Sequence, residues 1–343
     1  MDWMIAALLT QDGLSTGAIY VLLAVSLVLV FAVTRVVNVA QGEFVAFAAL
    51  TVAQLQDGRL PGITFMVLGG GVLAMTMEVL ARRSGAGLWR PALLYLGLPA
   101  ALSAGAWAAS SWSAPYGVVL VLTVALVTVL GPIVYRVAFQ PIASASALTL
   151  LIAAIALHFV LTGLGLYFFG PEGVRTPALV DGGFEVAGMP VAFQPLLVIA
   201  LSGLAMLALY LFSGFTLAGK ALRAVALHRR GALLMGIATD RAGGQAFALA
   251  ALIGALSGVL IGPMVTIYYD SGFLLGLKGF VGAIVGALSL YPTAAVGALL
   301  VGMIEAFGSF WASAYKEVVV FTLILPVLLW RWFASPVHED AHD

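Results

Sequence analysis

The chain has 343 residues, of which 63% are hydrophobic and only 9% are charged. Fifteen Lys and Arg balance fifteen Asp and Glu, so nucleic-acid binding has no electrostatic basis. There are no cysteines, which excludes disulfides and thiolate metal sites. Since a soluble globular domain carries about 25% charged residues, this composition, with a mean hydropathy of +1.12, indicates a protein of the lipid bilayer.

Apolar stretches recur along the whole chain, and their length of about 20 residues suits membrane-spanning helices. The alternation of apolar and polar residues that marks membrane strands is missing. We therefore predict an all-α, polytopic transmembrane bundle of about 9–11 segments. In chain order the candidate spans are Leu14–Val33, Val39–Gln54, Pro61–Ala81, Pro91–Ser113, Tyr116–Ala138, Ala145–Phe169, Val191–Ser213, Gln245–Gly262, Leu277–Leu290, Thr293–Ala312 and Val318–Trp332.

The basic residues predict the orientation. Placing the loop after Ser213 in the cytoplasm puts eleven of the fifteen Lys and Arg inside, a strong positive-inside bias. The N-terminus is then outside and the C-terminus cytoplasmic. One membrane domain, residues 1–336, accounts for nearly the whole chain, and a disordered tail is expected at 337–343.

Two candidate spans are short for simple crossings. Val39–Gln54 starts beside Asn38 and Glu43, and Leu277–Leu290 leads into a Tyr-Pro pair at 291–292. Polar or Pro-bearing backbone at membrane depth is tolerated only where it is buried in protein or lines a cavity. We therefore predict broken or re-entrant helices near 38–46 and 277–292.

The largest cytoplasmic segment spans residues 214–244. Within it Leu222 and Val225 fall on one stripe at helical spacing, while Lys220 and Arg223 fall on another. The pattern fits either an interfacial helix with its basic face among anionic lipid headgroups or a short helix that docks into a cytoplasmic partner. Periodicity does not choose between these two interpretations.

The segment Gly219–Ile237 resembles the cytoplasmic loop of permease subunits in ABC importers of the branched-chain amino acid (LivH-type) family. Two further blocks match that family in the same order along the chain. The first runs from Gly17–Tyr20 to Arg35–Phe44, and the second runs from Gly276–Phe280 to Gly302–Glu305. The chain departs from the family at Val39, Gln41, Arg230 and Gly231, and it is longer by roughly one helical hairpin, within about 61–113. The resemblance implies that the loop couples to an ATPase. The coupling candidates are Lys220, Arg223, Ala226, Arg230, Ala232, Met235 and Gly236.

The same resemblance implies the partners and the setting. They are two ATPase subunits, a second permease subunit in a homo- or heterodimer, a periplasmic substrate-binding protein and the lipid of the bacterial cytoplasmic (inner) membrane. The implied substrates are branched-chain or other amino acids, with urea and short amides among the substrates of relatives. In that family the binding protein docks on the outer side, where the loop Gly170–Pro190 is otherwise a solvated connector.

Ionisable side chains at membrane depth cost about 2.5–3.5 kcal/mol on insertion scales and are functional candidates by default. Glu43 either ties down the freed N–H groups of a helix start or lines the transport path. Lys278 and Glu305 lie in neighbouring segments, where pairing would offset part of each desolvation cost. His158 is expected to be a hydrogen-bonded packing residue. The candidates for the translocation path or for a broken helix are Asn38, Gln41, Gly42, Glu43, Lys278 and Glu305.

The sequence contains no Gly-x-x-x-x-Gly-Lys-Ser/Thr loop, so the chain itself cannot cradle ATP phosphates. Spacings typical of a catalytic triad or a metal site are also missing. We expect no enzymatic activity, no cofactor and no metal. The predicted function is the permease subunit of a bacterial ABC importer, and the alternative is a stand-alone secondary transporter or channel for small polar solutes.

Overall fold

The computed structural model describes residues 3–81, 87–112, 114–186, 189–285, 288, 290–322, 326 and 329. Within these ranges eight helical segments are long and apolar enough to cross a membrane. The all-α, polytopic prediction is confirmed. The eight segments are α1 (Trp3–Thr34), α3 (Ile63–Ala81), α4–α5 (Trp89–Ser111), α6 with its continuation (Tyr116–Ile142), α7 (Ala147–Phe169), α8 (Phe193–Phe215), α11 (Thr239–Ile261) and α13–α14 (Tyr291–Thr322).

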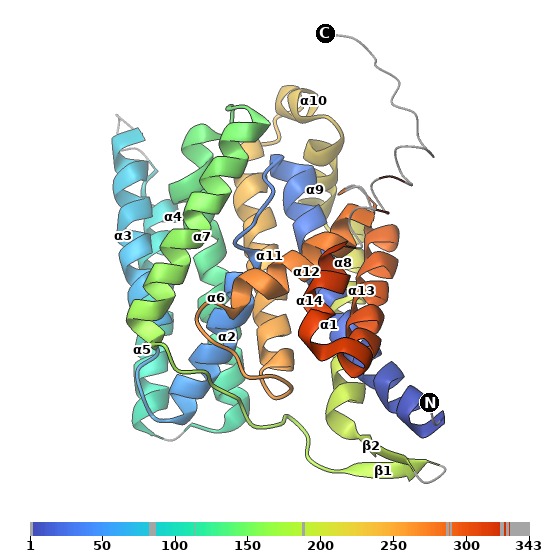
Figure 1. The fold of residues 1–343 in the computed structure, drawn as a ribbon. Helices are drawn as coiled ribbons and strands as arrows, with labels where there is room; N and C mark the ends of the chain where they lie inside the picture. The colour runs from blue at the N-terminus through green and yellow to red at the C-terminus, as the bar shows by residue number, and fades with distance from the viewer. Residues whose placement is uncertain are drawn as a thin grey trace.

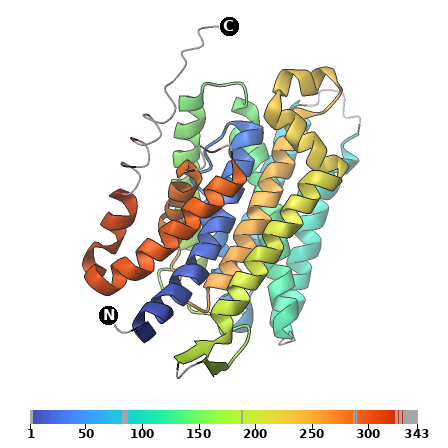
Figure 2. The ribbon, with the colours of Figure 1, turned by 90° about the vertical axis from the view of Figure 1, so that its right-hand side faces the viewer.

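The helices α1 and α11 run through the middle of the bundle (Figures 1 and 2). In the most apolar window of α1 83% of the residues are buried, against 17% in the peripheral α8. Small residues let α13 approach α1 closely, since a Cβ built on Gly17 would lie 3.2 Å from the Cα of Leu299. Close approach of this kind replaces the hydrophobic driving force that lipid does not supply.

The chain breaks between α1 and α2 (Gln41–Gln56), at residues 35–40, so only 38–40 of the predicted 38–46 are non-helical. Arg35 adopts a φ of 62° and ends α1. The chain then descends into the bundle without helical structure, as Figure 1 shows, and Val36 and Asn38 are fully buried on the way. Since α2 has only 16 residues, it spans about 24 Å at 1.5 Å per residue, less than a hydrocarbon core of about 30 Å.

The helix α12 (Ser271–Val285) is the second short element, with 15 residues. It begins six residues before the predicted start at Leu277. Beyond its end Leu288 adopts a φ of 55°, and residues 286, 287 and 289 of the predicted break lie outside the described residues. Together with α2 it brings the segments of the described ranges to ten, within the predicted range.

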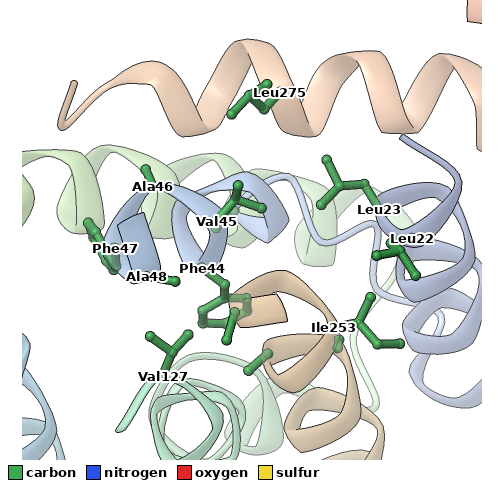
Figure 3. Close-up of a cluster of buried hydrophobic side chains, with 14 of the residues drawn as sticks. Leu22, Leu23, Phe44, Val45, Ala46, Phe47, Ala48, Val127, Ile253 and Leu275 are labelled. Atoms are coloured by element: carbon green, nitrogen blue, oxygen red, sulfur yellow. The ribbon is translucent and has the colours of Figure 1, made fainter. Parts of the chain in front are cut away.

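The side chains of α2 fill the space between α11, α12 and α6 (Figure 3). Phe44 and Val45 lie beside Ile253 of α11, Val127 of α6 and Leu275 of α12. Glycines set the spacing on the α11 side, because a Cβ on Gly254 would lie 2.7 Å from the Cβ of Phe44. The short helix is therefore held on every side by protein, as irregular backbone at this depth requires.

The segment 61–113, where an extra hairpin is predicted, contains α3 and α4 (Trp89–Ala92), which passes through a π-helical turn at Leu93–Gly97 into α5 (Leu98–Ser111). That this pair is an addition stays a prediction. These helices lie at the edge of the bundle in Figure 1. Glu78 of α3 forms an ion pair with the Nε of Arg136 at 3.0 Å. Arg136 lies in a π-helical turn, Tyr135–Phe139, between α6 (Tyr116–Val134) and a 3₁₀ turn at Gln140–Ile142.

The two ends of the bundle differ. A hairpin of β1 (Gly183–Val186) and β2 (Met189–Ala192), which the sequence did not predict, lies at the end where α1 begins. At the opposite end are α9 (Leu217–Leu227) and α10 (Arg229–Leu234), here called the tip, residues 217–236. The orientation predicted from the basic residues would place the tip in the cytoplasm, and this orientation stays a prediction.

The last two helices labelled in the described ranges form a V, seen at the left of Figure 2. After α13 (Tyr291–Ala312) a 3₁₀ turn at Ser313–Tyr315 leads into α14 (Lys316–Thr322). The predicted last span, Val318–Trp332, extends mostly beyond the described residues, as does the predicted tail at 337–343.

Candidate functional site

A cavity of about 570 Å³, here called the charged cavity, lies between α1, α12, α13 and the loop 263–267 that follows α11. The Nε of Arg175 donates a hydrogen bond to the Pro263 carbonyl at 2.9 Å. Val174 and Ile267 exchange two backbone hydrogen bonds, which tie the loop before β1 to the loop after α11. The charged residues that line the cavity are Asp12, Arg175, Lys278, Glu305 and Lys316.

Lys278 of α12 occupies the wall of the charged cavity and binds two carboxylates. Its Nζ lies 2.5 Å from Oε1 of Glu305 in α13 and 3.1 Å from Oε1 of Glu317 in α14. The hydroxyl of Tyr20, which is buried in α1, donates to the other oxygen of Glu305 at 2.6 Å. The predicted pairing of Lys278 with Glu305 is present, and the cluster joins four helices around one buried ammonium.

Glu43 in the first turn of α2 is fully buried and binds His158 of α7, with 2.5 Å between Oε1 and Nδ1. The His158 ring also stacks on Phe273 of α12, with ring centroids 4.7 Å apart. His158 is thus a hydrogen-bonded packing residue, as expected. The carboxylate does not cap the start of α2; it links α2 to the peripheral α7.

The remaining polar residues of the break bind one another and α11. Asn38 donates from Nδ2 to Oε1 of Gln41 at 3.1 Å, and Gln41 donates from Nε2 to the carbonyl of Ala250 at 2.9 Å. Gly42 lies where α2 crosses α12, with its backbone against Gly272. The six path candidates therefore form two groups, one at the break of α2 and one, Lys278 with Glu305, in the wall of the charged cavity.

The tip is a folded unit that rests on the ends of two central helices. The hydroxyl of Thr216 accepts from the N–H of Gly219 at the start of α9, and Nδ1 of His228 accepts from the N–H of Gly231 at the start of α10. A small core attaches the tip to α1 and α11. Its buried members are Val33, Leu222, Val225, Ala232, Ala242 and Ala246.

The coupling candidates differ in exposure. Ala232 belongs to the small core and is buried, so it supports the tip rather than presenting a surface. The others are exposed, apart from the half-buried Ala226. Four apolar side chains of the tip are the most open, Leu217 at 86%, Leu227 at 85%, Leu234 at 89% and Met235 at 83% exposed. The sequence analysis missed Leu227 and Leu234.

The chain matches the family described as branched-chain amino acid transport system, permease component, over residues 9–328. It belongs to this family. The permease protein LivH of the high-affinity branched-chain amino acid transport system of Escherichia coli is 27% identical over 334 residues, covering 93% of this chain and 91% of LivH. The corresponding BraD protein of Pseudomonas aeruginosa is 26% identical over 333 residues, covering 93% of this chain and 92% of BraD.

Membership assigns the chain the part of a membrane permease in an ABC transporter rather than a catalytic part. The eight candidate spans agree with a multi-pass membrane protein. For this permease the sequence pointed to Lys278, Glu305 and Glu43. It missed Tyr20 and Glu317, although Asp12, Thr16 and Tyr20 follow one another at four-residue spacing, the signal of a single helix face.

Proposed function

We propose that the chain is the permease subunit of an importer in the bacterial cytoplasmic membrane and that separate ATPase subunits drive it through the tip. The observation that carries the proposal is the apolar surface of the tip. Leu227, Leu234 and Met235 are exposed at one end of the bundle, where a membrane protein meets water. Exposed apolar side chains gathered on one surface are typical of contacts with a protein partner or with the membrane, and their position at the end of the bundle favours a protein partner.

The tip is also built to transmit motion. Because its buried face packs against Val33 of α1 and Ala242 of α11, a displacement of the tip acts directly on the two central helices. Both helices also contact α2, which carries the break. Closure of a pair of ATPase subunits would then bias two arrangements of the membrane helices, which is the basis of alternating access.

The substrate proposed is a branched-chain or another amino acid, delivered by a periplasmic binding protein and passed through a dimer of permease subunits. Two findings support this. The relatives LivH and BraD belong to branched-chain amino acid transport systems. The lining of the charged cavity includes Gln194 at the start of α8, which follows the β hairpin at the end opposite the tip. The path residues proposed are Lys278 and Glu305 in the cavity wall, with Asn38, Gln41, Gly42 and Glu43 at the break.

The test is affinity purification of the tagged chain from its native membrane, followed by identification of the co-purifying proteins. Walker-motif ATPases are expected with the wild type and are expected to be lost with Met235→Glu. The matched control is Met4→Glu, which adds the same charge at the other end of the bundle, where Met4 is 38% exposed. Recovery of the chain alone, under conditions that keep another importer intact, would favour the stand-alone transporter.

A further inference from the structure

The charged cavity offers hydrogen-bond donors on one side that the protein leaves unused. Gln194, at the start of α8, is 8% exposed; its Oε1 accepts from the Leu179 N–H at 3.0 Å, while its Nε2 has no partner among the described residues. A buried donor without a partner is unfavourable, because it has given up its hydrogen bonds to water. Its place in the cavity lining indicates a ligand acceptor there.

Arg175 lines the same cavity, and only part of the hydrogen-bonding capacity of its guanidinium is used. Its Nε is held by the carbonyl of Pro263. The two terminal nitrogens have no hydrogen bond to any described residue, and guanidinium nitrogens of this kind match the two oxygens of a carboxylate. Lys278 is the weaker ligand for a carboxylate, because two carboxylates already bind two of its three ammonium donors.

Acceptors come from α1 and α13. Asp12 and Tyr20 lie on one face of α1, which turns toward the cavity, and the carboxylate of Asp12 has no hydrogen-bond partner among the described residues. Glu305 accepts from Tyr20 and Lys278 through one oxygen each. Since a carboxylate offers about four acceptor positions, Glu305 retains capacity for a further donor.

The charges around the cavity balance. Asp12, Glu305 and Glu317 carry three negative charges, and Arg175, Lys278 and Lys316 carry three positive ones. A balanced set of separated charges favours a solute that is neutral overall but carries both signs. Much of the remaining wall, between hydroxyl side chains such as Thr16 and Ser271, is apolar and suits a hydrocarbon side chain. Its members include Ile261, Met264, Ile267, Leu274, Leu275 and Ala306.

We infer that the charged cavity is a binding site of the permease itself for the zwitterionic head group of an apolar α-amino acid. Arg175 and Gln194 bind the carboxylate, and Asp12 and Glu305 bind the ammonium. The inference rests on the proposed transport function and adds that this subunit, and not only a soluble binding protein, distinguishes zwitterions from uncharged amides.

The test measures binding of tritiated L-leucine to the purified permease complex in nanodiscs without any binding protein. Unlabelled leucinamide, which lacks the carboxylate, and 4-methylpentanoate, which lacks the ammonium, serve as competitors. Arg175→Gln is expected to weaken the binding of leucine and of 4-methylpentanoate about tenfold or more, while the affinity for leucinamide stays unchanged. Asp12→Asn is expected to weaken the binding of leucine and of leucinamide and to leave the affinity for 4-methylpentanoate unchanged.

Glu172→Gln is the matched control, because Glu172 is an exposed charge of the same loop that does not line the cavity. It is expected to bind all three probes like the wild type. Absence of leucine binding to the wild type, or equal weakening of all three probes by Arg175→Gln, would overturn the inference. If ATPase subunits still co-purify in that case, the proposed function is retained and only the proposed binding site is rejected.

Discussion

The crossing of α2 and α12 allows a graded test of how closely two short helices must pack in this permease. A Cβ built on Gly272 would lie 2.8 Å from the backbone nitrogen of Glu43, and one on Gly276 would lie 3.0 Å from that of Gly42. Ordinary contacts begin at 3.4 Å. Gly272→Ala therefore needs a helix shift of about 0.6 Å and Gly276→Ala one of about 0.4 Å, since backbone atoms cannot rotate away.

Overpacking of a tight interior costs about 1–3 kcal/mol, whereas alanine favours a helix over glycine by about 1 kcal/mol. The net effect expected is a loss of about 1–2 kcal/mol for Gly272→Ala and of about 0–1 kcal/mol for Gly276→Ala. Thermal unfolding of the purified protein in detergent, monitored by intrinsic tryptophan fluorescence, shows which of the two variants is the less stable.

Gly69→Ala in α3 and Gly163→Ala in α7 are the matched controls, because a Cβ at either position meets nothing within 4 Å. Both are expected to unfold at or above the temperature of the wild type. The reasoning fails if Gly272→Ala is as stable as Gly69→Ala, or if Gly276→Ala is the more damaging of the two α12 variants.

Three further outcomes are expected from buried groups. Lys278→Leu leaves Glu305 buried without its cation and should cost about 3–5 kcal/mol, read as a lower unfolding temperature; a second change, Glu305→Leu, should recover part of the loss. His158→Leu should destabilise the protein by a similar amount, and adding Glu43→Gln should relieve it, because a buried amide costs less than an unpaired carboxylate; a double-mutant cycle without coupling would contradict this. Ala232→Trp should push α10 off its small core and abolish uptake while membrane insertion persists, so normal uptake would argue against a supporting role for this residue.

The sequence predicted the chemistry of individual segments better than the contacts between them. Lys278 and Glu305 stood out because charges are rare in apolar segments, and their pairing followed from neighbouring positions. Tyr20 is 285 residues from Glu305 in the chain, and a tyrosine in an apolar helix has many possible neighbours. Glu317 was not singled out because it lies at the edge of an apolar segment, where a charge is usually solvated.

At the tip, family resemblance located the segment but not its rotation. Ala232 was a coupling candidate beside Met235, yet the structure buries the first and exposes the second. The residues Leu227 and Leu234 were overlooked because apolar positions of an amphipathic helix normally face the lipid or the core. Exposure at a helix end depends on where the neighbouring helices stop, which no local pattern records.

The polar atoms of the break in α2 also determine when this region is able to fold during synthesis. Glu43 and Gln41 leave the ribosome early, but their partners follow much later: His158 comes 115 residues after Glu43, and Ala250 comes 209 residues after Gln41. At about 5–20 residues per second, the second interval lasts about 10–40 s. The segment carries an unpaired carboxylate until His158 is made and an unpaired amide until Ala250 is made, and the translocon and the headgroup region must shelter these groups. Completion of the polar contacts of α2 thus depends on translation of the last third of the chain.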